Sequence, residues 1–439
     1  MMSKKYWNER VETRTREELE AYQLEQLKQQ ITEAYEKSPF YRKSFETANV
    51  KPEDIQSLED LIKFPILTKH EIRERQDAVP IIGDLCVRSE EDVVFISSSS
   101  GSTGAPTASP FSKRDFDEFQ DIQSRLFWQA GMRPTDRYIH ALNFSLFVGG
   151  PDVIGAQNLG ALCIWAGTLP ADRLLFIIQQ YQPTVIWTTP SYAWYLGETA
   201  RQKGINPATD LAINKIIVAG EPGGSIPATR EAIEALWDAE VFDFYGISDI
   251  FGACGAQCEA HDGLHIAEDQ MLVEVVDETT GLPVKEGERG EMLLTTLRKE
   301  IRPMIRFRTG DIVTYTNEKC SCGRTLKRIK VVGRIDDMFI AGGVNVFPSD
   351  IEHVIRKFDT LTGEYRINIV EDRHIVKFTV EVEKREDVAI DTEVLREQVS
   401  YEIKIKLGVK PKEVIILEDG ALPRATHKAK RIVDLREAR

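Results

Sequence analysis

The stretch Ser97-Ser-Ser-Ser-Gly-Ser-Thr-Gly-Ala-Pro-Thr107 follows the strand-like segment Asp92-Val-Val-Phe-Ile96. Its glycines let the backbone turn tightly and approach a ligand closely. Consecutive backbone N–H groups and hydroxyls can surround a polyphosphate without any charged side chain. The stretch does not fit the nucleotidase pattern G-x-x-x-x-G-K-S/T, because Gly101 and Gly104 are too close together and Ala105 stands where a lysine is expected. It therefore predicts a phosphate-binding loop of another kind, and the alternative is a flexible Ser/Gly linker.

Composition limits the classes of protein to which the chain can belong. Its 439 residues predict two or three domains, and 42% hydrophobic with 29% charged residues allows a sizeable core. The formal net charge of -14 argues against nucleic acid or an anionic membrane as a partner. We find no apolar run of membrane-spanning length and no signal core near the N-terminus. Six cysteines fit a reducing compartment better than a disulfide scaffold, so we expect a cytoplasmic protein.

From about residue 90, short apolar runs alternate with helix-like segments. Such alternation indicates a parallel sheet covered by helices on both faces, with ligands at the carboxyl ends of the strands. Two of the expected helices are Ala171–Gln180 and Thr229–Trp237. The expected strands are Val93–Ile96, Ala161–Trp165, Thr184–Thr188, Lys215–Ala219 and Glu240–Phe244.

The rest of the chain predicts a long N-terminal helix over residues 15–48, antiparallel strands after residue 271, and a mixed C-terminal part. Helices are expected there over 350–358 and 392–406, with strands over 366–370, 375–382 and 413–417. The predicted fold class is α/β. A large N-terminal domain (1–335) has parallel sheets flanked by helices and a β-rich part at about 271–335, and a small α+β domain (336–439) follows.

Several motifs follow the serine-rich stretch in a specific order. They are Tyr245-Gly-Ile-Ser-Asp249, Arg306-Phe-Arg-Thr-Gly-Asp311, Gly333-Arg-Ile-Asp-Asp-Met338, Gly342-Gly-Val-Asn-Val-Phe-Pro348 and Pro423-Arg-Ala-Thr-His-Lys-Ala-Lys-Arg431. This order resembles the adenylate-forming superfamily of acyl-CoA synthetases, adenylation domains and luciferases. Within it, the chain is most similar to the phenylacetate–CoA ligase family. The resemblance extends over almost the whole length and includes Tyr6-Trp-Asn-Glu9, Ser38-Pro-Phe-Tyr-Arg42 and Pro65-Ile-Leu-Thr-Lys69.

The resemblance implies an acid–thiol ligase that uses ATP and Mg2+. The enzyme would turn an aryl carboxylic acid into an acyl adenylate, and coenzyme A would then displace AMP to give a thioester. One alternative keeps the adenylation but passes the acyl group to an amine, a hydroxyl or a carrier-protein thiol. Another is a zinc-bearing binding protein with a vestigial nucleotide site. The resemblance also suggests a homodimer.

The resemblance assigns nucleotide-binding roles to specific positions. Asp311 would accept hydrogen bonds from the ribose hydroxyls, Arg334 would reach the ribose and α-phosphate, and Asp249 would hold magnesium. The family more often has a glutamate at this position, and the side chain of Asp249 is one methylene shorter than glutamate. The alternative role of Asp249 is a helix cap. The phosphate loop would contribute Ser99, Ser100, Gly101, Ser102, Thr103, Gly104 and Thr107. The adenine slot would contribute Gly220, Glu221, Pro222, Tyr245 and Gly246, and Ser248 would also bind the nucleotide.

The resemblance implies that the small C-terminal domain is a lid that moves between the two steps of the reaction. Lys428 resembles the lysine that bridges the substrate carboxylate and the α-phosphate, although His427 stands where glycine is usual. Asp336 and Asp337 lie at the implied hinge between the domains. A second orientation of the lid would bring Gly342 and Gly343 toward the active site for thioester formation.

Soft thiolates and imidazoles predict a structural zinc site. We favour Cys258, His265, Cys320 and Cys322 as ligands, because the Cys-x6-His pattern before Glu268-Asp269 resembles the members of the family that carry cysteine and histidine at these places. Cys254 or His261 could substitute, and unliganded thiols are the alternative.

The acid pocket is expected in the segment His140–Gly150, at Asn143, Phe144, Phe147 and Gly149. Packing in the hydrophobic core explains Phe144, Phe147 and Gly149 equally well. Strict phenylacetate ligases carry a tyrosine- and glycine-rich version of the segment, so phenylacetate, benzoate, indoleacetate and other aryl acids all stay open as substrates.

Overall fold

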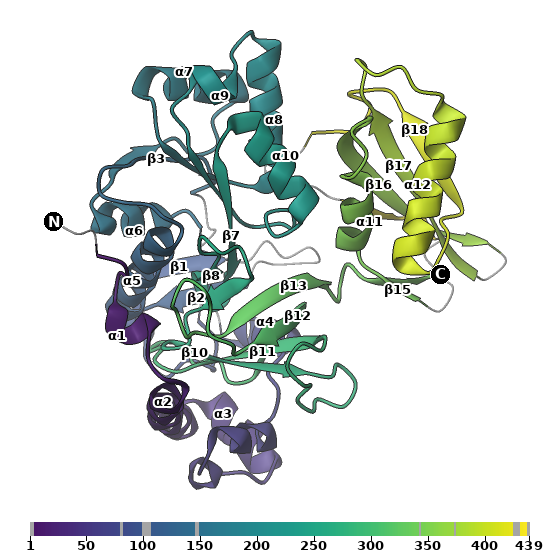
Figure 1. The fold of residues 1–439 in the computed structure, drawn as a ribbon. Coiled ribbons are helices and arrows are strands. Elements are labelled where there is room, and N and C mark those ends of the chain that lie inside the picture. The colour runs from purple at the N-terminus through teal and green to yellow at the C-terminus, as the bar shows by residue number, and fades with distance from the viewer. Residues whose placement is uncertain are drawn as a thin grey trace.

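The computed structural model of the protein describes residues 4–79, 82–98, 107–144, 149–341, 344–372, 375–424 and 431–436. Within these ranges the largest element is an eleven-stranded mixed sheet in the order β10-β11-β12-β13-β9-β8-β7-β6-β5-β3-β4 (Figure 1). Its parallel half consists of β3 (Arg137–His140), β4 (Leu162–Trp165), β5 (Val185–Thr188), β6 (Lys215–Val218) and β7 (Glu240–Ile247). The carboxyl ends of these strands therefore meet at one edge.

Alternating side chains of the parallel strands enter two different hydrophobic cores. Tyr138 and Trp187 pack into the core that contains α5 (Lys113–Gln129) and α6 (Asp152–Leu159). Ile139 and Ile186 point to the opposite core. That core is completed by α7 (Ala171–Tyr181), α8 (Pro190–Gln202) and α10 (Pro227–Trp237), with the short α9 (Pro207–Asp210) beside them. Helices thus cover both faces of the parallel half of the sheet. This is needed because successive side chains of each strand point to opposite faces and both sets are buried.

Strand β7 joins the two halves of the sheet. Residues 240–243 pair in parallel with β6, and residues 244–247 pair antiparallel with β8 (Phe251–Ala256). The antiparallel half continues through β9 (Leu264–Ile266), β10 (Met271–Val276), β11 (Gly290–Thr296), β12 (Phe307–Thr316) and β13 (Arg328–Arg334). The predicted β-rich part is therefore continuous with the parallel sheet.

The C-terminal part has a core of its own. Helices α11 (Pro348–Ile355) and α12 (Thr392–Leu407) pack on a sheet of order β18-β17-β16-β19. Its strands are β16 (Leu361–Asp372), β17 (Ile375–Lys384), β18 (Glu413–Leu417) and β19 (Ile432–Asp434), preceded by the hairpin β14 (Phe339–Ala341) and β15 (Val344–Val346). The predicted fold class, a large α/β part followed by a small α+β part, is confirmed. We keep the boundary between residues 335 and 336 as a proposal.

Two local predictions were wrong. The predicted helix over 15–48 is broken into α2 (Arg16–Lys37) and α3 (Pro39–Thr47), because the residue before a proline is driven out of helical geometry and Ser38 has ψ 118. The predicted strand Val93–Ile96 lies outside the large sheet: β1 (Phe95–Ser98) pairs only with β2 (Ala108–Phe111) as a two-stranded hairpin among the described residues. The N-terminal part also contains α1 (Glu9–Glu12), α4 (Lys69–Ala78) and the 3-10 helices Pro52–Asp54, Leu58–Lys63 and Glu90–Asp92.

Among the residues that the structure describes, no helix combines the length and the apolarity that crossing a membrane requires.

A buried ion pair ties the N-terminus to the antiparallel half. The Glu12 carboxylate accepts hydrogen bonds from Arg324 Nε at 2.7 Å and from the Asn8 backbone N–H at 2.8 Å. The two charged side chains are 0% and 3% exposed. The Thr325 N–H also donates to the Glu12 carbonyl at 3.2 Å. Removing one charge from such a pair would leave the other buried without compensation.

We predict that Arg324→Met lowers the free energy of unfolding by about 3–5 kcal/mol, measured by urea titration. The double variant Glu12→Leu with Arg324→Met should recover most of this loss, because no buried charge then stays unpaired. Equal stability of the single variant and the native protein would contradict this role, and so would an equal loss in both variants.

Candidate active site and metal centre

The described ends of the serine-rich stretch lie side by side. Ser98 is the Cα partner of Ala108 in the β1–β2 register, so both described ends of the stretch lie at the same end of this hairpin. Thr107 is fully buried, and its Oγ1 has no hydrogen-bond partner among the described residues. This hydroxyl is therefore available to a ligand at the base of the stretch. The other predicted residues of the loop lie outside the described residues: Ser99, Ser100, Gly101, Ser102, Thr103 and Gly104.

The β1–β2 hairpin also positions the turn between β7 and β8. Ser97 Oγ donates to the Ser248 carbonyl at 3.3 Å, and Ser109 Oγ donates to the Asp249 carbonyl at 3.1 Å. The Asp249 carboxylate is 4% exposed, and its Oδ2 accepts an ion-paired hydrogen bond from Lys69 Nζ at 3.0 Å. Its Oδ1 is buried without a partner among the described residues. One oxygen is thus neutralised and the other is free for a cation.

Lys69 is a site residue to which the sequence analysis gave no role. It is the first residue of α4, whose Thr68 and Glu71 form a capping box. This cap fixes the start of the helix and so the point from which the Lys69 side chain extends. The sequence signal was the T-x-x-E pattern, but nothing in the sequence indicates that the lysine meets a carboxylate 180 positions later.

The predicted ribose ligand Asp311 lies at the centre of a hydrogen-bonded group. Its Oδ1 accepts from Arg334 Nη1 at 2.7 Å, and its Oδ2 accepts from the Tyr245 hydroxyl. The aspartate is 4% exposed. Burial raises the pKa of Asp311, and the Arg334 guanidinium opposes that rise. The structure thus brings Tyr245, Asp311 and Arg334 together from three strands.

The turn before Asp311 opens onto a cavity. Gly310 has φ +75, and a Cβ there would lie 3.3 Å from Arg334 Nη2, so a larger residue would be strained. The cavity has a volume of about 410 Å³ and includes Lys69 and Arg334 in its lining. The other lining residues are Thr68, Glu278, Glu291, Arg308, Thr309, Gly310, Ile312, Ile335, Asp336 and Met338. The lining thus combines three cationic side chains with three carboxylates, so a ligand there would meet both signs of charge.

The loop after β6 forms the other wall of the predicted adenine slot. Gly220 has φ +93, and Glu221 Oε1 accepts from the Ser191 N–H at 2.8 Å, which attaches the loop to the start of α8. Gly220 and Pro222 are exposed. Gly246, beyond Tyr245 on β7, is also exposed, as a residue facing a nucleotide base should be.

The predicted acid pocket is described in part. Phe144 stacks on Trp165 with centroids 5.4 Å apart and lies 4.7 Å from the ring of His140. A Cβ at Gly150 would come within 2.8 Å of Phe144 Cα, so the backbone folds back tightly here. Asn143 and Gly149 are described beside these rings, whereas Phe147 lies outside the described residues. The geometry therefore places aromatic rings, but no complete pocket, at this position.

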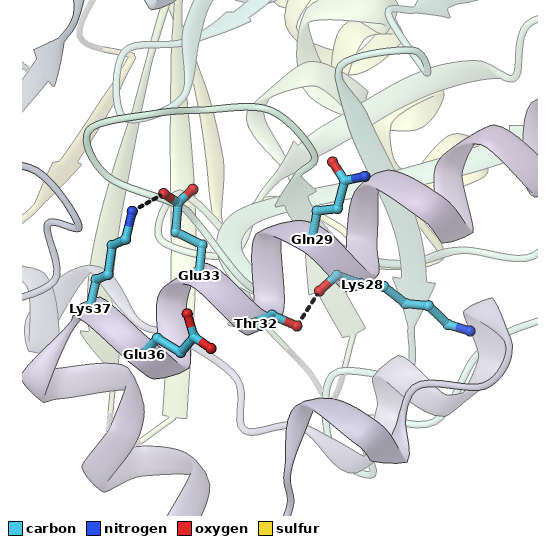
Figure 2. A pocket seen from close by; sticks show the side chains of 6 residues that line it. All are labelled: Lys28, Gln29, Thr32, Glu33, Glu36 and Lys37. Carbon is cyan, nitrogen blue, oxygen red and sulfur yellow. Dashed lines mark hydrogen bonds and ion pairs between the residues drawn. The ribbon is translucent and has the colours of Figure 1, made fainter.

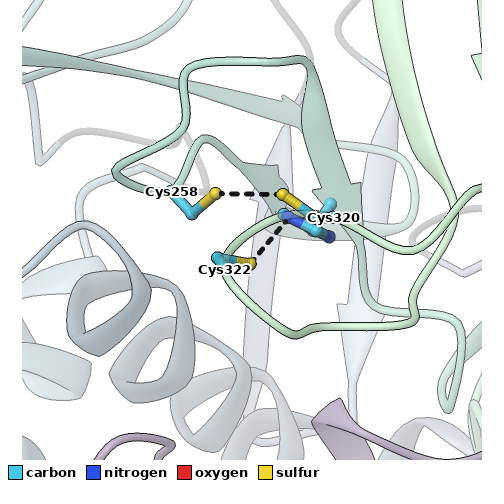
Figure 3. Close-up of side chains that lie close together, drawn as sticks. Cys258, Cys320 and Cys322 are labelled. Carbon is cyan, nitrogen blue, oxygen red and sulfur yellow. Dashed lines mark hydrogen bonds between the residues drawn. The ribbon is translucent and has the colours of Figure 1, made fainter.

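The four favoured metal ligands lie together. Cys258 Sγ is 3.7 Å from Cys320 Sγ, and Cys322 Sγ is 3.6 Å from His265 Nε2 (Figure 3). All four donor atoms lie within 4.8 Å of one another, and all four residues are buried. Tetrahedral zinc, with Zn–S of about 2.3 Å and Zn–N of about 2.0–2.1 Å, requires S–S separations of about 3.8 Å and S–N separations of about 3.6 Å. The donor set and spacing fit a zinc ion.

The surroundings of the cluster support a metal-binding tautomer of His265. The second ring nitrogen, Nδ1, lies 3.3 Å from the Leu326 carbonyl and can donate to it, which leaves Nε2 as a ligand. Hydrogen bonds from Cys258 and His265 lower the pKa of Cys322. The two alternative ligands lie elsewhere: Cys254 belongs to the main core, and the His261 ring stacks on Phe242 at 5.1 Å.

The remaining predicted residues are at the C-terminal side. The Asp336 carboxylate lies 3.6 Å from the Arg334 guanidinium, and the Asp337 N–H donates to the Arg334 carbonyl at 3.3 Å. The implied hinge therefore adjoins the hydrogen-bonded group around Asp311. Lys428, Gly342 and Gly343 lie outside the described residues.

A second hollow lies on the exposed side of α2 (Figure 2). Side chains of this one helix line it, with Lys37 Nζ 2.7 Å from Glu33 Oε1. Such an i,i+4 pair on a helix surface is a common solvated contact, and every residue that lines the hollow belongs to α2. We assign no site to it.

Comparisons with known proteins agree with this arrangement. The AMP-binding enzyme family matches residues 12–296, and the AMP-binding enzyme C-terminal domain matches residues 343–436. The phenylacetate-coenzyme A ligase of Escherichia coli (strain K12) is 36% identical over 438 residues, which cover 97% of each chain. The corresponding ligase of Thermus thermophilus is 34% identical and covers 97% of this chain and 99% of its own.

Solved structures extend the likeness to the arrangement of domains. A 2-hydroxyisobutyryl-CoA ligase in the postadenylation state, in complex with 2-HIB-AMP, has a TM-score of 0.93 at 31% identity, covering 99% of this chain and 93% of its own. In complex with 2-HIB-AMP and CoA in the thioesterification state, the same ligase has a TM-score of 0.75, covering 100% and 94%. The chain belongs to the AMP-binding enzymes and, within them, to the phenylacetate–coenzyme A ligase family.

Proposed function

We propose that the protein is an ATP-dependent aryl acid–CoA ligase that works through an acyl adenylate. The observation that carries this proposal is the group of Tyr245, Asp311 and Arg334 beside a cavity whose lining includes Lys69 and Arg308. A buried carboxylate can accept two hydrogen bonds from neighbouring ribose hydroxyls. The family's phenylacetate-coenzyme A ligases and the 2-hydroxyisobutyryl-CoA ligase trapped with acyl-AMP and CoA support the same order of steps.

The chain's own residues would handle the charge of the reaction. Thr107 and the serine-rich loop before it would hold the β- and γ-phosphates, and Lys69 would contribute a positive charge at the same edge. Asp249 would hold Mg2+ through its unpartnered Oδ1, because a hard cation prefers carboxylate oxygens. The ion would neutralise phosphate charge that develops as pyrophosphate leaves. Lys428 would bring the carboxylate and α-phosphate together.

Two orientations of the C-terminal part would serve the two steps. In the present one, the Arg356 guanidinium lies 4.8 Å above the Trp194 ring, and Thr229 Oγ1 donates to Glu352 at 3.3 Å. These contacts join α11 to α8 and α10. The higher TM-score to the postadenylation state of the relative supports assigning this orientation to the end of adenylation. A rotation would then present Gly342 and Gly343 to the bound adenylate.

Acid-dependent exchange of labelled pyrophosphate into ATP tests the adenylation step with a panel of aryl acids. The proposal expects exchange with at least one aryl acid and, when CoA is added, a CoA thioester and AMP as products. Exchange without a thioester would support transfer to another acceptor instead, such as an amine, a hydroxyl or a carrier-protein thiol. No exchange with any acid would contradict an adenylating enzyme. A homodimer and a cytoplasmic location stay predictions.

Lys428→Ala should separate the two chemical steps. We predict that it slows adenylation by about 100- to 1,000-fold, since it removes a cation from a developing anionic centre. Thioester formation from preformed acyl adenylate and CoA should change little, because this lysine would act only in the first orientation. Single-turnover assays of each step measure the split, with Lys410→Ala, an exposed lysine, as the control. An equal loss in both steps would argue against the role of Lys428.

We also propose that Cys258, His265, Cys320 and Cys322 hold a structural zinc ion. The purified protein should contain about one zinc per chain by mass spectrometry of the metal. Cys320→Ser should lose it and lower the melting temperature by about 5 °C or more, given about 2–4 °C per kcal/mol for large domains. Cys254→Ser, a buried cysteine outside the cluster, should keep the metal. A metal-free native protein, or full zinc in Cys320→Ser, would rule out this site.

A further inference from the structure

Asp152 is a buried acid whose carboxyl group has no hydrogen-bond partner among the residues that the structure describes. It is the first residue of α6 and is 1% exposed. A carboxylate in the first turn of a helix normally accepts a backbone N–H. Here neither Oδ1 nor Oδ2 makes a hydrogen bond to any described residue. A buried polar group left unsatisfied costs stability, so its presence requires an explanation.

The backbone around this carboxyl connects it to the acid pocket. A Cβ at Gly252 would lie 2.8 Å from Asp152 Oδ1, and a Cβ at Gly149 would lie 3.9 Å from Oδ2. Gly149 belongs to the predicted acid pocket. Gly252 of β8 lies close to Gly246 of the neighbouring strand β7, because a Cβ added at Gly246 would be 2.5 Å from the Gly252 carbonyl oxygen. The carboxyl group therefore lies next to Gly149 of the predicted acid pocket and one strand away from Gly246 of the proposed nucleotide site.

A second unpartnered polar atom lies in the same region. His140 is fully buried, and its Nδ1 pairs with the Tyr138 hydroxyl at 2.7 Å. Its Nε2 has no partner among the described residues, and its ring lies 4.7 Å from Phe144. Burial lowers the pKa of His140 to about 3 and raises that of Asp152 well above its usual value. The region therefore presents neutral groups that donate and accept hydrogen bonds, beside aromatic rings.

We propose that Asp152 is a specificity-determining residue whose carboxyl group hydrogen-bonds a hydroxyl or amino substituent of the acid. The inference rests on the proposed function, and it narrows the substrates to aryl acids that carry such a neutral polar group. The carboxylic acid form offers an O–H donor and a carbonyl acceptor, so it can pair with either substituent. An unsubstituted ring would leave the carboxyl buried and unpaired, and sites of that kind discriminate strongly against such analogues.

The test compares kcat/KM for matched acids in the full-length protein with ATP, Mg2+ and CoA. The probes are phenylacetate and benzoate, each with its ortho, meta and para hydroxy and amino derivatives. The native protein should prefer its best substituted acid over the parent by at least about 30-fold. Asp152→Leu and Asp152→Ala should bring that ratio to about one or below, mainly by raising KM for the substituted acid. Asp152→Asn, which keeps the size and hydrogen-bonding capacity, should restore most of the preference.

Asp115→Asn is the matched control, since that buried carboxyl accepts the Glu300 N–H at 2.7 Å and is already satisfied. It should change the melting temperature without changing the substrate ratio. If Asp152→Leu does not fold, the Ala and Asn variants still decide the question. An unchanged ratio in every folded Asp152 variant, with acid activity intact, would overturn the inference but leave the ligase standing. No activity of the native protein with any acid would overturn both.

Discussion

The hydrogen bonds to the buried Asp311 carboxylate connect the parts of the molecule that a ligase of this family must coordinate. Tyr245 comes from the carboxyl end of β7, where the parallel half of the sheet ends. Asp311 lies in β12, and Arg334 is the last residue of β13, directly before the C-terminal part. Any ligand that pairs with this carboxylate therefore contacts the sheet edge and the hinge together. If Asp311 holds the ribose as proposed, the position of the C-terminal part and the occupancy of the nucleotide site would be linked through this carboxylate.

Much of the fold could be predicted because buried strands leave a strong local signal. The strand Glu413–Leu417 begins and ends at the predicted residues, since its apolar run Val414–Leu417 lies between Glu413 and Glu418. Strand β3 was missed because its four residues begin with arginine and end with histidine. Strand β8 was missed because its small residues, Gly252 to Ala256, resemble a loop, although their size is what lets the β7–β8 turn pack closely.

The candidate site was predictable where chemistry is concentrated in a motif and not where it depends on distant pairing. The cysteine and histidine cluster was found because thiolates and imidazoles at short spacing suit a metal, and the resemblance to the family selected four ligands from the six candidates. The pairing of Lys69 with Asp249 could not be found, since it joins the start of a helix to a turn far along the chain. The same holds for Asp152, because its sequence position is that of an ordinary helix-starting acid. Only the structure shows that its carboxyl is buried without a partner among the described residues.

Discrimination between ATP and 2′-deoxyATP tests most directly whether the Asp311 carboxylate holds the ribose. Dissociation constants of both nucleotides should be measured by calorimetry for the native protein and for Asp311→Asn. The account predicts that the native protein binds ATP at least about tenfold more tightly, from the loss of one hydrogen bond to a charged group, and that the variant loses this preference. Equal affinity of the native protein for both nucleotides would contradict the account, and so would a preference that survives the substitution.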